Sequence, residues 1–156
     1  MAGHAPLPYG ETAERPPFRF SAVTRVGFDE TDAQGVVYYG RYLPYFDHAR
    51  VEYHRHLGLR PRLEGTTAEF AMRASEIEYH APARFDDLLE VFVRIARIGR
   101  TSVTYDHAAY RVDDDRLMVT ATQTLVLVDP EERRSVPIPD GYRESVRGFE
   151  GEDLDA

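Results

Sequence analysis

Residues 42–58, YLPYFDHARVEYHRHLG, contain the clearest helical repeat in this sequence. Apolar side chains recur three or four residues apart, at Leu43, Phe46, Ala49, Tyr53 and Leu57. Pro44 falls in the first turn, where a missing backbone N–H is tolerated, and Gly58 supplies a stop signal. We therefore predict one long helix over residues 42–57.

Segments with the period of a β-strand surround this helix. Residues 18–28 form a first candidate strand, and after Gly65 apolar and other side chains alternate from Phe70 to Tyr79. Leu89, Val91, Val93 and Ile95 share one face of a further strand, and short turns at 99–100, 113–115 and 129–130 separate strands at 101–112 and 117–128. This order predicts an α+β fold, with an antiparallel sheet of about five strands and one long helix on one face.

Composition narrows the classes of protein. A chain of 156 residues predicts one domain, which we place at residues 18–146, with flexible tails at 1–17 and 147–156. The absence of cysteine excludes disulfides and thiolate chemistry, and all 19 basic residues are arginine, which excludes lysine-based catalysis. The net charge of −8, without a basic block, argues against nucleic acid or an anionic membrane as partner. No apolar run reaches the roughly 20 residues of a bilayer span, so we expect a soluble, cytoplasmic protein.

An acidic cluster and a glycine precede the helix, in the sequence FDETDAQGVVYYGRYLPYFD of residues 28–47. The first turn of a helix presents unpaired N–H groups and a partial positive charge, which favour binding of a developing oxyanion. A carboxylate just upstream then faces an electrophilic carbonyl. We interpret Asp29 and Glu30 as solvated turn residues. Asp32 is either the residue for this chemistry or a residue that caps the turn with its side chain.

The order Asp32, Gly35, Val36, Val37, Tyr38, Tyr39, Tyr42, Leu43, Phe46 closely resembles the signature of hotdog-fold thioesterases of the hydroxybenzoyl-CoA thioesterase type. The match is specific from Val26 to Gly58 and is one of strand pattern only from Ile77 to Val128. The resemblance implies a hotdog fold, in which the sheet wraps around a central helix, and an enzyme that hydrolyses acyl-CoA thioesters without a cofactor. It also implies that Asp32 is the nucleophile or general base and that the Tyr39 backbone N–H is the oxyanion donor. The implied substrate-binding residues are Gly35, Val36, Val37, Tyr38, Tyr42 and Phe46.

One departure from the family pattern concerns residues 36–39, where many relatives carry a histidine or asparagine. Here the Tyr39 phenol is either a hydrogen-bond donor to the substrate or a packing group. The histidines do not predict a metal site, because His48, His54 and His56 on the helix lack the i, i+4 spacing. We expect His80 and His107, in strands, at the surface or at a subunit contact.

Arginine pairs are candidates for holding the phosphates of CoA at a subunit boundary. Arg60 and Arg62 follow the helix, and Arg97 and Arg100 end a strand. The expected partner is an acyl-CoA or an acyl-carrier protein, and polar and apolar alternation on both sheet faces predicts a homodimer or homotetramer. Two alternatives are a hotdog protein that binds acyl thioesters without cleaving them and a hotdog dehydratase or hydratase.

Overall fold

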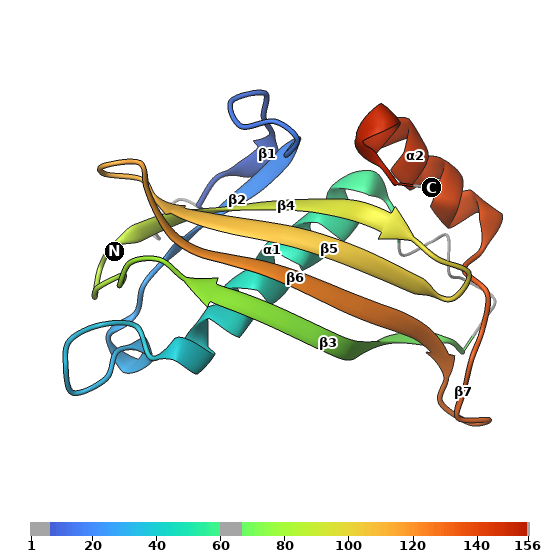
Figure 1. Ribbon diagram of the computed structural model, residues 1–156, viewed down its shortest axis with the longest axis horizontal. Helices are drawn as coiled ribbons and strands as arrows, with labels where there is room; N and C mark the ends of the chain where they lie inside the picture. Colours follow the sequence, from blue (N-terminus) through green and yellow to red (C-terminus); the bar gives the residue numbers. More distant parts are fainter. Residues whose placement is uncertain (1–6, 60–66, 156) are drawn as a thin grey trace, which may run out of the picture.

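A single antiparallel sheet forms most of the molecule (Figure 1). The computed structural model describes residues 7–59 and 67–155. The strands lie in the order β1-β2-β4-β5-β6-β3, and β7 pairs with β6. Their bounds are β1 Tyr9–Glu11, β2 Phe20–Arg25, β3 Glu69–Tyr79, β4 Leu88–Ile98, β5 Ser102–Arg111, β6 Arg116–Asp129 and β7 Arg134–Ser135.

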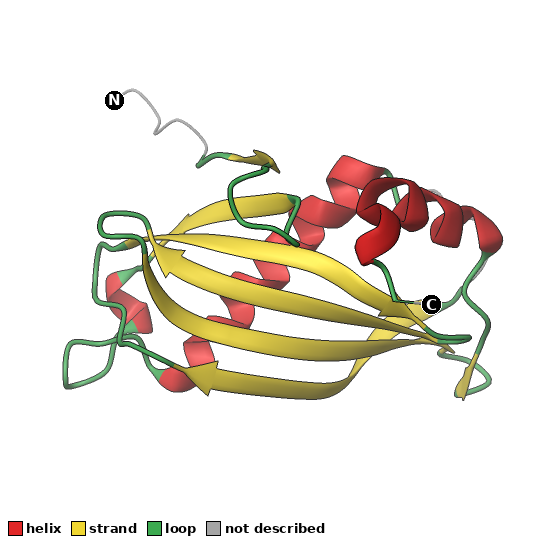
Figure 2. Ribbon diagram, turned by 45° about the horizontal axis from the view of Figure 1, so that its top comes forward, coloured by secondary structure: helices red, strands yellow, loops and turns green. Residues whose placement is uncertain are grey.

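The long helix α1, Tyr42–Leu57, lies across one face of the sheet (Figure 2). Its bounds are those predicted, and Gly58 ends it in the left-handed region with φ +63°. A second helix, α2, covers Asp140–Glu150, and short 3₁₀ turns lie at η1 Phe28–Glu30, η2 Tyr39–Arg41 and η4 Gly151–Asp153. The predicted hotdog arrangement, an antiparallel sheet around one long helix, is confirmed. Among the described residues, no helix is both long and apolar enough to cross a bilayer.

The core lies between α1 and the inner face of the sheet, which is the face turned toward α1. Phe46 and Tyr53 of α1 are fully buried there, together with the alternate strand residues Leu89, Val91, Val93, Ile95, Val103, Ala109 and Leu127. Burial of this apolar surface is the main favourable term for the fold. The opposite, outer face carries mostly polar and small side chains.

Both ends of the described chain contribute structure where flexible tails were expected. Within the expected N-terminal tail, β1 pairs with β2, which together with β7 raises the number of strands above the predicted five. At the other end α2 continues past Arg147 to Glu150, whose side chain is buried. The physical reason is an apolar stripe at helical spacing, Tyr142, Val146 and Phe149, which packs against the core.

The C-terminal residues cover a stretch of β4 that β2 leaves unpaired. β2 pairs with β4 only from Leu88 to Phe92. Beyond this point the Ile95 N–H donates to Glu150 Oε2 at 3.0 Å, and the Asp155 N–H donates to the Ala96 carbonyl at 2.8 Å. The C-terminal segment thereby satisfies backbone groups that would otherwise form an open sheet edge.

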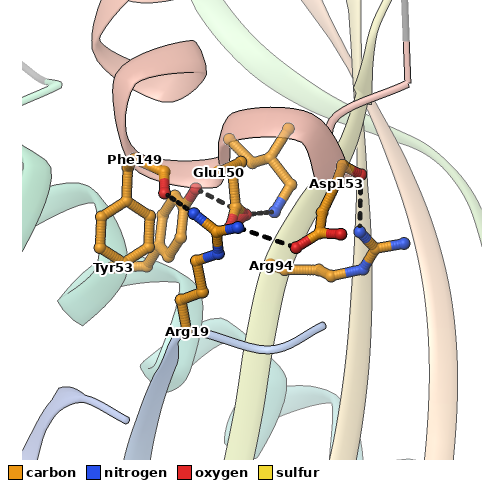
Figure 3. A network of polar contacts seen from close by, with 7 residues as sticks. Arg19, Tyr53, Arg94, Phe149, Glu150 and Asp153 are labelled. Atoms are coloured by element: carbon orange, nitrogen blue, oxygen red, sulfur yellow. Dashed lines mark hydrogen bonds and ion pairs between the residues drawn. The ribbon is translucent and has the colours of Figure 1, made fainter. Parts of the chain in front are cut away.

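Two arginines hold this segment from both sides (Figure 3). Arg19 donates to the Phe149 carbonyl at 2.8 Å and to the Asp153 carboxylate at 2.9 Å, and Arg94 donates to the Asp153 carbonyl at 3.0 Å. The Tyr53 hydroxyl donates to Glu150 Oε2 at 3.3 Å. Burial raises the pKa of Glu150 to about 7. The hydrogen bonds from the Ile95 N–H and the Tyr53 hydroxyl, and the charges of Arg94 and Arg19, oppose this shift.

We expect Glu150 to make stability depend on pH. Because its pKa is higher in the folded chain than in the unfolded chain, the folded state binds more protons between about pH 4.5 and 7. Stability should therefore fall as pH rises through this window, by about 3 kcal/mol, since each pKa unit corresponds to about 1.4 kcal/mol. Glu150→Gln keeps an oxygen for both hydrogen bonds and should remove this slope in urea unfolding measured from pH 5 to 8. The exposed Glu152→Gln is the control, and equal slopes in both variants would contradict the assignment.

Candidate active site

Asp32 lies in a tight loop that its own backbone closes. The Asp32 N–H donates to the Val36 carbonyl and the Gly35 N–H donates to the Asp32 carbonyl, both at 2.9 Å. The Asp32 carboxylate accepts the Gln34 N–H at 2.8 Å. Gly35 has φ +78°, a conformation that other residues rarely adopt, which explains the glycine at this turn. The loop therefore fixes the direction in which the Asp32 carboxylate leaves the chain.

The far side of this loop is attached to the connection between β3 and β4. The Val37 N–H donates to the Ala83 carbonyl at 2.8 Å, and Val36 forms a bridge with Arg84. Val37 is buried, so the loop is packed onto the body of the protein through one apolar side chain. Of the predicted substrate-binding residues in the loop, Gly35 and Tyr38 are exposed and Val36 is half-buried.

The helix start lies directly after the loop. Tyr39 is the first residue of η2, which leads without a break into α1, and no backbone carbonyl accepts its N–H within residues 7–59 and 67–155. The Tyr39 side chain is 63% exposed and lies against the Tyr38 ring, with 4.3 Å between centroids. The neighbouring Tyr39 phenol raises the pKa of Tyr38, so that hydroxyl is neutral at pH 7.

Tyr42 and Phe46, both predicted to contact substrate, are core residues in the single chain. The Tyr42 hydroxyl accepts the Ala83 N–H at 3.3 Å, and burial raises its pKa. Phe46 is fully buried and stacks on His107 with 4.8 Å between ring centroids. Tyr42 therefore contacts the residue that also binds the Val37 N–H of the loop, whereas Phe46 packs against β5.

Asp32 itself is exposed in the single chain. The loop projects at the end of the sheet where β3 finishes (Figure 1). The Tyr79 hydroxyl, on the last residue of β3, donates to the Tyr39 carbonyl at 3.0 Å. Among the described strands β3 pairs with β6 alone, so the candidate active site borders the other edge of β3.

Arg97 and Arg100 are not brought to Asp32 within one chain. β4 begins beside the Asp32 loop, because the residues just before it bind Val26 and Val37, and Arg97 lies at its other end. Nine residues of strand correspond to about 30 Å. Arg100 is exposed in the turn to β5. The other candidate pair, Arg60 and Arg62, lies outside the described residues.

A partly buried chain of polar contacts crosses from α1 to β3, and sequence reasoning missed it. Arg50 Nη1 donates to Gln123 Oε1 at 3.3 Å, and Gln123 Nε2 donates to the Ser75 hydroxyl at 3.1 Å. Arg50 also pairs with Asp47 at 2.8 Å. The available signal was the strand period, since Gln123 alternates in phase with the buried Ala121 and Leu125.

The expected surface position of His107 is wrong. His107 is buried, because it shares the inward-facing period of Val103, Tyr105 and Ala109 on β5. Burial and the charge of Arg50 lower the pKa of His107 to about 3, against a smaller opposing effect of Gln123. Burial and Arg50 likewise lower the pKa of His54 to about 4, and His54 contacts the Tyr105 and Tyr142 hydroxyls. Both rings are therefore neutral parts of the core at pH 7.

His80 is exposed, as expected, and contacts the Thr120 hydroxyl. Within the described ranges, no three side chains of His, Asp or Glu are placed to hold a metal ion.

Comparison with known proteins places this chain among thioesterases. The sequence model of the thioesterase-like superfamily matches residues 26–146. The chain is 33% identical over 116 residues to the acyl-CoA thioester hydrolase YbgC of Escherichia coli O6:H1, covering 74% of this chain and 86% of that protein. It is 32% identical to the acyl-CoA thioesterase YbgC of Haemophilus influenzae, covering 77% of this chain and 88% of that protein.

Solved structures agree with this placement. The crystal structure of a probable thioesterase from Bartonella henselae matches 77% of this chain and 97% of its own, with a TM-score of 0.68 and 31% identity. A thioesterase superfamily protein from Jannaschia sp. CCS1 matches 90% of this chain and 89% of its own, with a TM-score of 0.79. At 22% identity the second likeness concerns the fold alone.

Proposed function

Because the chain belongs to the thioesterase-like superfamily, we propose that it hydrolyses the thioester bond of an acyl-CoA, or of an acyl-carrier protein. The products are a carboxylic acid and a free thiol. The names of the relatives from Escherichia coli and Haemophilus influenzae support the substrate class. The observation that carries the proposal is the pairing of a fixed carboxylate, Asp32, with a helix start whose first N–H, on Tyr39, has no backbone acceptor in the described part of the chain.

In the proposed reaction Asp32 either attacks the thioester carbonyl or takes a proton from the attacking water. The Tyr39 N–H stabilises the negative charge that develops on the carbonyl oxygen. The loop pairing, with Thr31 opposite Val37, leaves about three residues, or roughly 10 Å, between the backbones of Asp32 and Tyr39. An aspartate side chain and the carbonyl group between them span this distance. The exposed Tyr39 phenol is available as a further donor to the substrate.

We further propose that a second copy completes the site by pairing along β3. This edge strand runs over 11 residues, and no other described strand pairs with the edge of β3 that faces away from β6, a form that readily adds another strand. The side chains of Met72 and Tyr79 on β3 are exposed. They lie on the same side of the molecule as the exposed Leu43 and Val51 of α1. These two residues are on the flank of the helix from which Arg50 reaches β6. Covering these side chains by a second copy would also remove Asp32 from bulk water.

Antiparallel pairing of two β3 strands explains the placement of the arginines. In such a pair the first residues of one strand lie beside the last residues of the other. The end of the sheet that carries Arg97 and Arg100 in one copy then approaches the Asp32 loop of the other. CoA bound across the boundary would have its thioester near Asp32 and its phosphates near arginines.

The function is tested by thiol release from short, medium, long and aryl acyl-CoAs, and from an acyl-carrier protein. We expect turnover on at least one of them with no added metal or cofactor. Binding without turnover across the whole panel would instead support the non-catalytic acyl-thioester-binding protein. Cytoplasmic location, and the absence of nucleic-acid and membrane partners, stay predictions of the sequence.

A further inference from the structure

The outer face of the sheet carries a groove with two arginines and a row of hydroxyls. We propose that Arg73 and Arg97, with the hydroxyls of Ser102, Thr104 and Thr124, form a binding site for a phosphate monoester. The groove has a volume of about 390 Å³ and is lined by these five residues and Ala74. The inference rests on the proposed function only for the origin of the phosphate.

Strand register aligns the groove across four neighbouring strands. Arg97 of β4 is opposite Thr104 of β5, and Thr104 is opposite Thr124 of β6. Thr124 is in turn opposite Ala74 of β3, and Arg73 precedes Ala74. The Thr104 and Thr124 hydroxyls are 3.3 Å apart. Hydroxyls therefore form the centre of the row and a guanidinium stands at each end.

The strands β3 and β4, which carry the two arginines, each have a shift in pairing register next to the arginine. The pairing of β3 with β6 shifts between Met72 and Ala74, so Arg73 is the extra residue of a bulge. The pairing of β4 with β5 shifts between Ile95 and Arg97. A bulge redirects the side chains next to it, and these two lie on either side of the same groove. β4 and β3 are three strand spacings apart, or about 14 Å, a distance that two extended arginine side chains span.

Neither guanidinium is neutralised within the chain. Among the described residues, no carboxylate forms an ion pair with Arg73 or Arg97, and no acceptor takes a side-chain hydrogen bond from either. Asp155, which forms a bridge with the Arg97 backbone, makes no ion pair with its side chain. Two unpaired cations facing one groove favour a dianion.

The neighbouring row of the same face limits the site. There Asp106 accepts from Arg94 and from the Thr122 hydroxyl, and Glu76 lies opposite Thr122. These carboxylates repel a phosphate, which confines it to the row of Thr104 and Thr124. Arg100 does not line the groove, and its carbonyl accepts from Arg143 and from the Ile138 N–H. The proposed site therefore pairs Arg97 with Arg73, and not with Arg100 as the sequence predicted.

The test is calorimetric titration at low ionic strength with adenosine 3′,5′-bisphosphate, the phosphorylated fragment of CoA. We expect Arg73→Gln and Arg97→Gln each to weaken its binding at least about tenfold, since each removes a charge-assisted hydrogen bond. Thr104→Val, which keeps the shape of the side chain, should weaken binding less. Arg116→Gln makes the same change of charge at an exposed position outside the groove and should bind as the unaltered chain does.

Two further ligands identify the source of the phosphate. Adenosine 5′-monophosphate lacks the 3′ group, so a clear preference for the bisphosphate assigns the site to CoA. Competition by inorganic phosphate at equal concentration assigns it to free phosphate. Either result supports the site, provided that both arginine variants lose the binding.

Other outcomes overturn the inference. It fails if the unaltered chain binds none of these ligands, or if both arginine variants bind as tightly as Arg116→Gln. If thioesters are still hydrolysed in that case, the proposed function stands without this site. If the unaltered chain binds the bisphosphate but hydrolyses no thioester, and both arginine variants lose the binding, the phosphate site is supported and the proposed function is rejected.

Discussion

Replacing Asp32 by asparagine is expected to lower kcat for the preferred thioester at least about a hundredfold, the range seen when an essential acid–base group is removed. Asparagine retains the oxygen that accepts the Gln34 N–H, so the loop keeps its shape while the negative charge is lost. Asp32→Ala removes both the charge and this hydrogen bond. We expect equal losses in the two variants, with melting temperatures within a few degrees of the unaltered protein, because the side chain is exposed.

Asp29→Asn is the matched control, since it makes the same change three residues earlier. It should retain nearly full activity if Asp29 is a turn residue. Retained turnover in both Asp32 variants, or an equal loss in Asp29→Asn, would show that the chemistry lies elsewhere.

Introducing a carboxylate at Val51 is expected to separate the two copies. Val51 of α1 is 49% exposed in the single chain, on the flank that we assign to the dimer. Each dimer would then bury two unpaired carboxylates, at more than about 2 kcal/mol each, so dissociation should become roughly a thousandfold more favourable. Sedimentation equilibrium measures this change, and turnover should fall with the dimer fraction.

Val112→Asp provides the comparison, because Val112 is 48% exposed and follows β5, away from the β3 edge. In a single chain the two changes should have similar effects on stability. A difference in mass between Val51→Asp and Val112→Asp therefore reports the interface alone. A protein that sediments as a monomer without any substitution, or a Val51→Asp variant with unchanged mass, would rule out pairing along β3.

The sequence predicted the parts of the fold that depend on local periodicity. The helix at 42–57 follows from spacing, a tolerated Pro44 and a glycine stop, and all three are local signals. The two end segments were misjudged for a different reason. Tyr9–Glu11 is too short to show alternation, and α2 is rich in charged residues, so its stripe of Tyr142, Val146 and Phe149 was overlooked.

The candidate site was predictable only as far as the motif extends. Asp32, Gly35 and Tyr39 occupy one loop and one helix start, and these are contiguous in the chain. The groove of Arg73 and Arg97 joins strands that are adjacent only through β5 and β6, so it depends on register and on two bulges. Register between distant strands is set by tertiary packing, which a single sequence does not reveal. The error at His107 has another cause. The alternation of β5 places this residue on the inner face, and only the polarity of the imidazole ring favoured a surface position.

Shielding of β4 by the chain's own C-terminus has a consequence for how copies associate. The C-terminal segment contacts the backbone of Ile95, Ala96 and Arg97, beyond the part of β4 that β2 covers, and β1 at this border of the sheet has only three residues. Growth by strand addition is thus possible in one direction. If two copies pair along β3, they cover the one long edge that the described strands leave unpaired, so we expect a finite assembly that resists extension into fibrils.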